Sequence, residues 1–173
     1  MKRIAAIALG LGSSTALADV SLQLTGLKVN VVGSAEYGGG GFNFQCTGTD
    51  TSLNDLATND GYFNIDIKMT FPSCQTNYGY KDIYLHVVGQ GSGQLSQNGE
   101  DGSVSSSGIL GFGHFKWGSN GPFDIYNSEG SYSVRQDSFG TVAATGNLQV
   151  QISGQTTDGK NARVSAQISY ITE

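Results

Sequence analysis

The residue types in this chain that most often carry chemistry are two cysteines, Cys46 and Cys74, and two histidines, His86 and His114. Nucleophilic hydrolysis requires an activated serine or cysteine together with a histidine and an orienting carboxylate. His86 falls inside an alternating strand pattern, His114 lies between a glycine and a phenylalanine, and no Gly-x-Ser-x-Gly segment is present. The histidines are therefore expected to be structural or solvent-facing, and the chain is predicted not to be an enzyme.

Two other sets of residues could act on carbohydrate. Exposed aromatic rings stack on sugars while nearby polar groups bind the hydroxyls, so Trp117, Tyr126 and Tyr132 are candidate ligand-binding residues of a self-contained secreted carbohydrate-binding module. Two carboxylates, Glu36 and Glu129, each adjoin an aromatic strand and would suit a small secreted glycosidase if they converged. Ordinary solvated acids are the simpler interpretation of these two glutamates.

The first eighteen residues have the features of a secretory signal peptide. Two basic residues at positions 2 and 3 precede an apolar run at 4–11, and Ala16-Leu17-Ala18 offers signal peptidase two small side chains before Asp19. The apolar run is too short to span a bilayer. We expect residues 1–18 to be removed and residues 19–173 to form one exported domain without a transmembrane anchor, located in the periplasm, at the cell surface or outside the cell.

Export determines the interpretation of the cysteines. An exported chain meets an oxidising compartment, so Cys46 and Cys74 are expected to form one intrachain disulfide. Oxygen ligands gather between Asp50 and Asp60, but they lack the spacing of a dedicated calcium loop and are typical of caps and turns. No metal or cofactor is therefore predicted, although a calcium site in this segment stays open.

The charge of the chain argues against nucleic acid as a partner. The formal charge is −5, and removing the two basic residues of the leader leaves −5 − 2 = −7. The remaining basic residues are scattered along the chain, so no cluster could neutralise several phosphates or bind an anionic membrane surface.

Apolar residues recur at a period of two through most of the chain, which predicts strands. The phase changes after Gly26, where a bulge is expected, and residues 51–58 are predicted to hold one short helical turn. The segment 89–107 is predicted to be an exposed loop or a weak hairpin, and two hairpins are expected further on, over residues 109–126 and 148–170.

About ten short strands with glycine-rich turns and no helical layer most simply make a single-domain antiparallel β-sandwich, immunoglobulin-like or jelly-roll, with a closed barrel as the alternative.

Four features together resemble the subunits of chaperone–usher fimbriae. They are the leader, the alternating Val20, Leu22, Leu24 and Gly26 at the mature terminus, the strand that leads to Cys74, and the alternating end of the chain at 163–170. The resemblance implies an incomplete immunoglobulin-like sandwich that assembles by donor-strand exchange.

On this resemblance Val20, Leu22 and Leu24 would be the side chains inserted into a neighbouring subunit, with Gly26 at the point of closest approach. Tyr170 would mark the end that a periplasmic chaperone recognises. The expected function is therefore that of an exported structural or adhesive protein whose partners are other subunits, a periplasmic chaperone and, in the alternative interpretation, a glycan.

Overall fold

The structure is a computed structural model that describes residues 21–59, 62–98, 101–118, 123–126, 128–139 and 145–172. All regular structure in these residues is antiparallel β-strand, which confirms the predicted class. The strands are β1 (Ser21–Tyr37), β2 (Gly40–Asn59), β3 (Tyr62–Thr76), β4 (Gly79–Asn98), β5 (Asp101–Trp117), β6 (Asp124–Ile125), β7 (Glu129–Phe139), β8 (Thr145–Gln155) and β9 (Asn161–Thr172). The part of the chain described here contains no helix long and apolar enough to cross a membrane.

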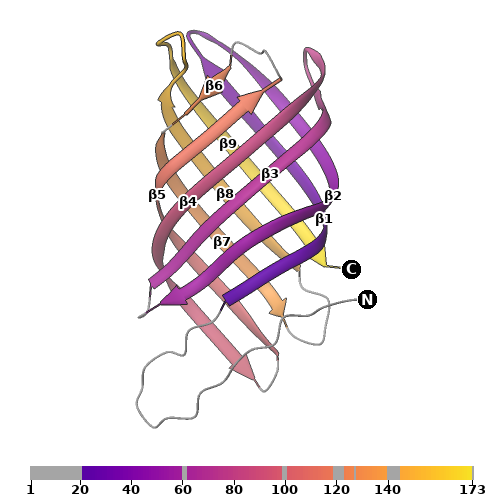
Figure 1. The fold of residues 1–173 in the computed structure, drawn as a ribbon, viewed down its shortest axis with the longest axis vertical. Coiled ribbons are helices and arrows are strands. Elements are labelled where there is room, and N and C mark those ends of the chain that lie inside the picture. Colours follow the sequence, from indigo (N-terminus) through magenta and orange to yellow (C-terminus); the bar gives the residue numbers. More distant parts are fainter. Residues whose placement is uncertain are drawn as a thin grey trace.

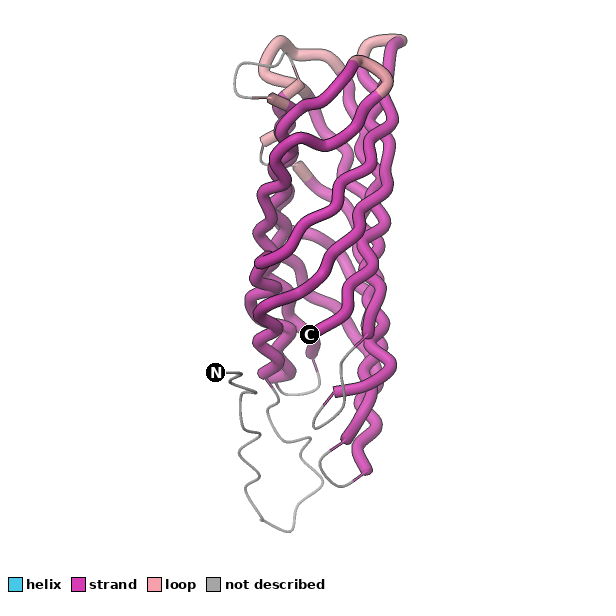
Figure 2. Tube along the Cα trace, turned by 90° about the vertical axis from the view of Figure 1, so that its right-hand side faces the viewer, coloured by secondary structure: helices cyan, strands magenta, loops and turns pink. Residues whose placement is uncertain are grey.

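The strands form one sheet whose two ends meet. Consecutive long strands pair with each other, β5 pairs with β7 past the short β6, and the pairings of β1 with β9 and of β4 with β5 complete a ring. In Figure 1, β3 and the first part of β4 cross the front of the molecule while β8 and β9 lie behind them. Figure 2 shows the same long strands from the side. Because the ring of pairings is closed, every long strand has a hydrogen-bonding neighbour on each side, although the ladder of β2 and β3 is interrupted between Gln45 and Leu56.

The core is formed by every second residue of each long strand. β8, and β3 as far as Phe71, alternate between buried and more exposed side chains, as strands with one face turned inward must do. At one end of the core, aromatic rings pack closely: Phe42 stacks on Trp117 with ring centroids 4.2 Å apart, and Phe115 meets Phe123 edge to face at 5.6 Å. Fully burying one such side chain contributes roughly 1.5–3 kcal/mol, so the alternation itself stabilises the closed sheet.

Three tight turns lie together at the upper end of Figure 1. The turn between β1 and β2 consists of Gly38 and Gly39, both with positive φ (50° and 88°), which is the conformation that two-residue hairpin loops favour and that glycine adopts at low cost. The turn between β8 and β9 is held by Thr156, whose hydroxyl donates to the Lys160 carbonyl oxygen at 3.2 Å. These short turns fix the register of the strands that they join.

The predicted helical turn at residues 51–58 is wrong. These residues belong to β2 and pair with the first part of β1, where Thr51 lies opposite Leu27 and Leu53 lies opposite Leu24. An isolated helical turn closes very few hydrogen bonds for the residues that it orders, whereas a neighbouring strand supplies a continuous ladder.

The segment 89–107 is a hairpin, so the predicted loop is wrong and the hairpin alternative is confirmed. Gln90 through Asn98 of β4 pair continuously with Asp101 through Ile109 of β5. A Cβ added at Gly91 would lie 2.6 Å from the Cα of Gly108, so small residues are required where the two strands approach each other. The hairpins predicted over residues 109–126 and 148–170 are also present, as β5–β6 and β8–β9.

The predicted disulfide joins two neighbouring strands. Cys46 of β2 and Cys74 of β3 are bonded, are both buried and have Cα atoms 4.4 Å apart. Cys46 follows Gln45 and Cys74 precedes Gln75, and beyond this pair of opposed glutamines the register of β2 and β3 shifts. The covalent bond therefore holds the two strands together at a point where their ladder is irregular.

We expect loss of this bond to lower the free energy of unfolding by about 3.5 kcal/mol, because the bond restricts a long segment of the unfolded chain. Its cysteines are 28 residues apart. Urea unfolding of the Cys46→Ala, Cys74→Ala double variant measures the change. Wild type treated with a reducing agent is the control and should match the variant, and an unchanged unfolding midpoint in both samples would contradict the expectation.

Candidate binding face

The side chains that point away from the core form the outer surface of the closed sheet, which we call the outer wall. Aromatic, imidazole and charged side chains gather on the part of this wall formed by β3 to β6. The set, which we call the aromatic–histidine face, consists of Asp66, Lys68, Tyr84, His86, Phe112, His114, Lys116, Asp124 and Tyr126. The described outward-pointing side chains of β1, β2, β7, β8 and β9 include no aromatic ring and are mainly Ser, Thr, Asn and Gln. The outer wall therefore has two chemically different sides.

The two histidines lie directly opposite each other on β4 and β5. His86 Nε2 is 2.9 Å from Asp66 Oδ1 on β3, and His114 Nε2 is 2.9 Å from Asp124 Oδ1 on β6. When Nε2 carries the proton and donates it to the carboxylate, Nδ1 of the same ring is left as an acceptor. Each aspartate thus fixes the orientation of one imidazole and turns it away from the other.

Each histidine also packs against an aromatic ring of the opposite strand. His114 meets Tyr84 with centroids 4.9 Å apart, and His86 meets Phe112 at 5.0 Å, both in the edge-to-face arrangement that aromatic pairs prefer. Tyr84 precedes His86 by two residues and Phe112 precedes His114 by two residues. Both contacts therefore join diagonal neighbours on the paired strands β4 and β5, and an approximate local two-fold axis relates one contact to the other.

Tyr126 is the most exposed ring of this face. Its side chain is 61% exposed, and its edge contacts are with His114 at 4.9 Å and Phe112 at 5.5 Å. At the other margin the Lys68 ammonium lies 5.9 Å from the centroid of Tyr84. Ring surface is therefore available to a ligand between groups that can donate or accept hydrogen bonds.

The charges of the face balance when the histidines are neutral. Asp66 and Asp124 carry two negative charges, and Lys68 and Lys116 carry two positive charges. Among the residues that the structure describes, no three His, Cys, Asp or Glu side chains converge as metal ligands would. The arrangement suits noncovalent binding of a ligand without a large net charge.

The three predicted ligand-binding residues are not brought together. Trp117 is 8% exposed and lies under Phe42, and Tyr132 is 3% exposed, with its hydroxyl donating to the Phe63 carbonyl oxygen at 3.0 Å. Both residues occupy strand positions whose side chains point into the core. Tyr126 alone of the three presents its ring to solvent.

The clustering of the two histidines with aromatic rings was not predicted from the sequence. Tyr84-x-His86 and Phe112-x-His114 share a spacing of two, which puts the members of each pair on one side of a strand. That spacing indicates that each histidine has an aromatic neighbour on its own face of the strand. It could not show that β4 and β5 pair in the register that sets His86 opposite His114.

The predicted assembly residues that the structure describes lie in the first part of β1 and near the end of β9. Val20 is outside the described residues, while Leu22 and Leu24 lie in β1 opposite Leu56 and Leu53 of β2. Register shifts on both sides of Gly26 agree with the expected bulge. Tyr170, the predicted chaperone-facing residue, is buried in β9 opposite Val29.

The two glutamates considered for glycoside hydrolysis lie on the other side of the wall. Glu36 of β1 is opposite Arg163 of β9, Arg163 is opposite Ser153 of β8, and Ser153 is opposite Glu129 of β7. The backbones of the glutamates are thus three strand spacings apart, about 14 Å at the usual spacing of neighbouring strands. Carboxyl groups in glycosidases lie about 5–10 Å apart, and here an arginine and a serine stand between the two.

Comparison of the chain with protein-family models, with curated proteins and with solved structures finds no match. Function is therefore inferred from the geometry and chemistry of the chain's own side chains. The aromatic–histidine face is the candidate that combines accessible rings with oriented polar groups.

Burial of Tyr132 leads to a prediction about alkaline stability. Burial raises the pKa of its phenol above the usual 10, while the hydrogen bond from Ser106 acts in the opposite direction. Because folding raises this pKa, the neutral phenol stabilises the folded state below pH 10. That stabilisation is lost as the pH rises through the pKa that the phenol has in the folded state. Tyr132→Phe should lower the free energy of unfolding by about 1 kcal/mol at pH 8, because the hydrogen bond of the hydroxyl is lost. Above pH 10 the variant should lose less stability than wild type, because it has no phenol to ionise.

Urea unfolding at pH 8 and at several values above pH 10 tests this expectation. Tyr126→Phe is the matched control, because its hydroxyl is removed from an exposed ring and stability should change little. An identical pH dependence in wild type and Tyr132→Phe would contradict the assignment.

Proposed function

We propose that this chain is an exported adhesive protein that binds neutral carbohydrate through the aromatic–histidine face. Export is supported by the leader-like segment 1–18 and by the disulfide between Cys46 and Cys74. The observation that carries the binding proposal is the interleaving of accessible aromatic rings with two histidine–aspartate pairs on one side of the wall.

Stacking accounts for the aromatic part of the face. The C–H groups of a sugar ring are apolar on one side and pack well on an aromatic surface, which the exposed ring of Tyr126 provides. The neighbouring Phe112 and His114 rings support Tyr126 from the side and restrict its rotamers. A ring that is already ordered loses less side-chain entropy when a ligand binds.

Hydrogen bonding accounts for the polar part. Sugar hydroxyls both donate and accept, and the face offers carboxylate oxygens and imidazole acceptors beside the ammonium groups of Lys68 and Lys116. The histidine–aspartate bonds of 2.9 Å hold two of these groups in place before any ligand arrives. Since the charges of the face cancel, a neutral glycan fits it better than a polyanion.

Tyr126→Ala should weaken glycan binding about tenfold, because loss of ring stacking and apolar contact removes on the order of 1.4 kcal/mol. The mature chain, residues 19–173, would be screened on a glycan array and the best ligand titrated by calorimetry. Tyr62→Ala is the matched control: Tyr62 of β3 is 56% exposed and lies outside the face. Absence of binding to every neutral glycan, or an equal loss in the control, would refute the proposal.

Strand exchange between subunits is a second candidate function, and one feature of β1 favours it. Ser21, Leu22 and Leu24 pair with β2, whereas the described pairing of β1 with β9 begins only at Leu27, opposite Thr172. The register of β1 and β2 shifts repeatedly over this stretch, so this part of the ladder is less regular than the rest. An irregularly paired strand with one open edge is well suited to pairing with another chain.

Deletion of residues 19–26 should abolish self-association of the mature chain without unfolding the domain, since the segment lies outside the β1–β9 ladder. Size exclusion with light scattering would measure the mass, and circular dichroism would verify the fold. A monomer both with and without the segment would exclude strand exchange and leave the glycan proposal untouched.

A further inference from the structure

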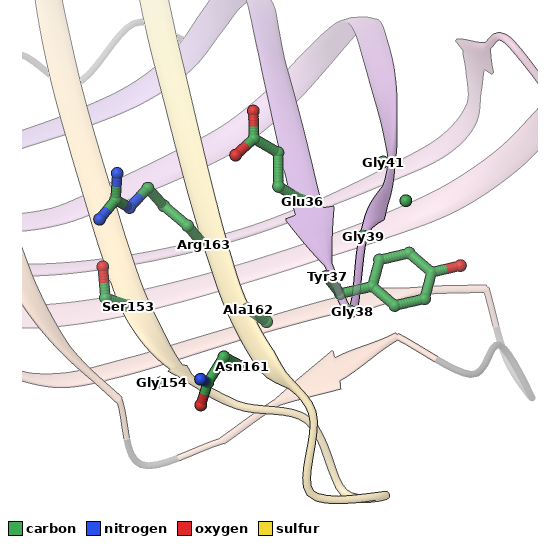
Figure 3. Close-up of a pocket in the computed structure, with 11 residues that line it drawn as sticks. Glu36, Tyr37, Gly38, Gly39, Gly41, Ser153, Gly154, Asn161, Ala162 and Arg163 are labelled. Carbon is green, nitrogen blue, oxygen red and sulfur yellow. The ribbon is translucent and has the colours of Figure 1, made fainter.

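A hollow of about 890 Å³ opens on the side of the wall away from the aromatic–histidine face, where the β1–β2 hairpin lies beside β9 and β8. Main chain forms much of its lining, through Gly38–Gly41, Gly154 and Ala162, so no large side chain from these positions fills it (Figure 3). Gly38 N–H donates to the Asn161 carbonyl oxygen at 3.3 Å, which ties the two hairpins together. The volume lies in the range of small-molecule sites.

Two opposite charges border this hollow. Glu36 of β1 and Arg163 of β9 are register partners, and both side chains are exposed. Residues of opposite charge in such positions commonly form an ion pair. In the described part of the chain, however, neither side chain has a hydrogen-bond or ion-pair partner, and Figure 3 shows their charged ends apart on neighbouring strands.

The rest of the lining supplies neutral hydrogen-bonding groups. Ser153 of β8 lies opposite Arg163, and Asn161 lies two residues before Arg163 on the same strand. The guanidinium offers a planar pair of donors that matches a carboxylate, and the Glu36 carboxylate can accept from an ammonium group. The charges of Glu36 and Arg163 cancel, so a ligand that uses both must itself carry one charge of each sign.

We propose that this hollow binds a small zwitterion of the α-amino acid type, with its carboxylate on Arg163 and its ammonium group on Glu36. Ser153 and Asn161 bind the remaining polar atoms, and the glycine hairpin lets the ligand approach the main chain closely. The site is independent of the carbohydrate proposal, because it shares no residue with the aromatic–histidine face.

The test is a titration of the ¹⁵N-labelled mature chain, residues 19–173, with a panel of L-α-amino acids. Each amino acid is compared with the amine that lacks its carboxylate and with the carboxylic acid that lacks its ammonium group. We expect saturable shifts of the amides at 36–41 and 161–163 with at least one amino acid and at least tenfold weaker binding of both singly charged analogues.

Glu36→Gln and Arg163→Gln should each weaken this binding at least tenfold. Glu129→Gln is the matched control, since it removes the same charge from a residue two strands away from Arg163 that does not line the hollow, and it should bind like wild type. No saturable shift with any amino acid, equal binding of a singly charged analogue, or an equal loss in the control would each overturn the proposal. Tyr126→Ala should leave amino acid binding unchanged, which separates this site from the glycan-binding face.

Discussion

The pairing of β4 with β5 and of β1 with β9 is the constraint on which the rest of the structure depends, because these two ladders join the ends of the sheet. A sheet with open ends would leave two rows of backbone groups without partners and would expose the edges of its apolar face. Closure places one side of every long strand in a common core. The outer side is then not needed to fill the core and can vary in chemistry from one strand to the next.

That freedom explains why the outer wall has two different sides. Around β8 and β9 the outward positions are mainly amides and hydroxyls, which remain hydrated at little cost. Around β4 and β5 the same positions carry imidazole and aromatic side chains, whose contacts also strengthen the ladder that closes the sheet. Stabilisation of the fold and presentation of a binding surface therefore rest on the same cross-strand contacts.

Local patterns were sufficient for much of the fold. The alternation of Phe63, Ile65 and Ile67 predicted a strand with one buried face, and the change of phase at Gly26 predicted a bulge. The pattern failed where polar or small residues dominated. Residues 51–58 and 89–107 have weak intrinsic preferences, and strands distant in sequence supplied the hydrogen bonds that made them extended.

The sequence by itself determined the all-β class, the pairing of its two cysteines and, for most strands, which residues share a face. All three follow from residue type and a period of two. Only the tertiary structure decided which strands close the ring and in what register. Register is a property of two strands at once, and it alone sets His86 opposite His114 and Glu36 opposite Arg163. Closure of the sheet also placed Tyr126 on the outer surface and Trp117 and Tyr132 in the core, since the two faces of a strand become inner and outer only when the sheet surrounds a core.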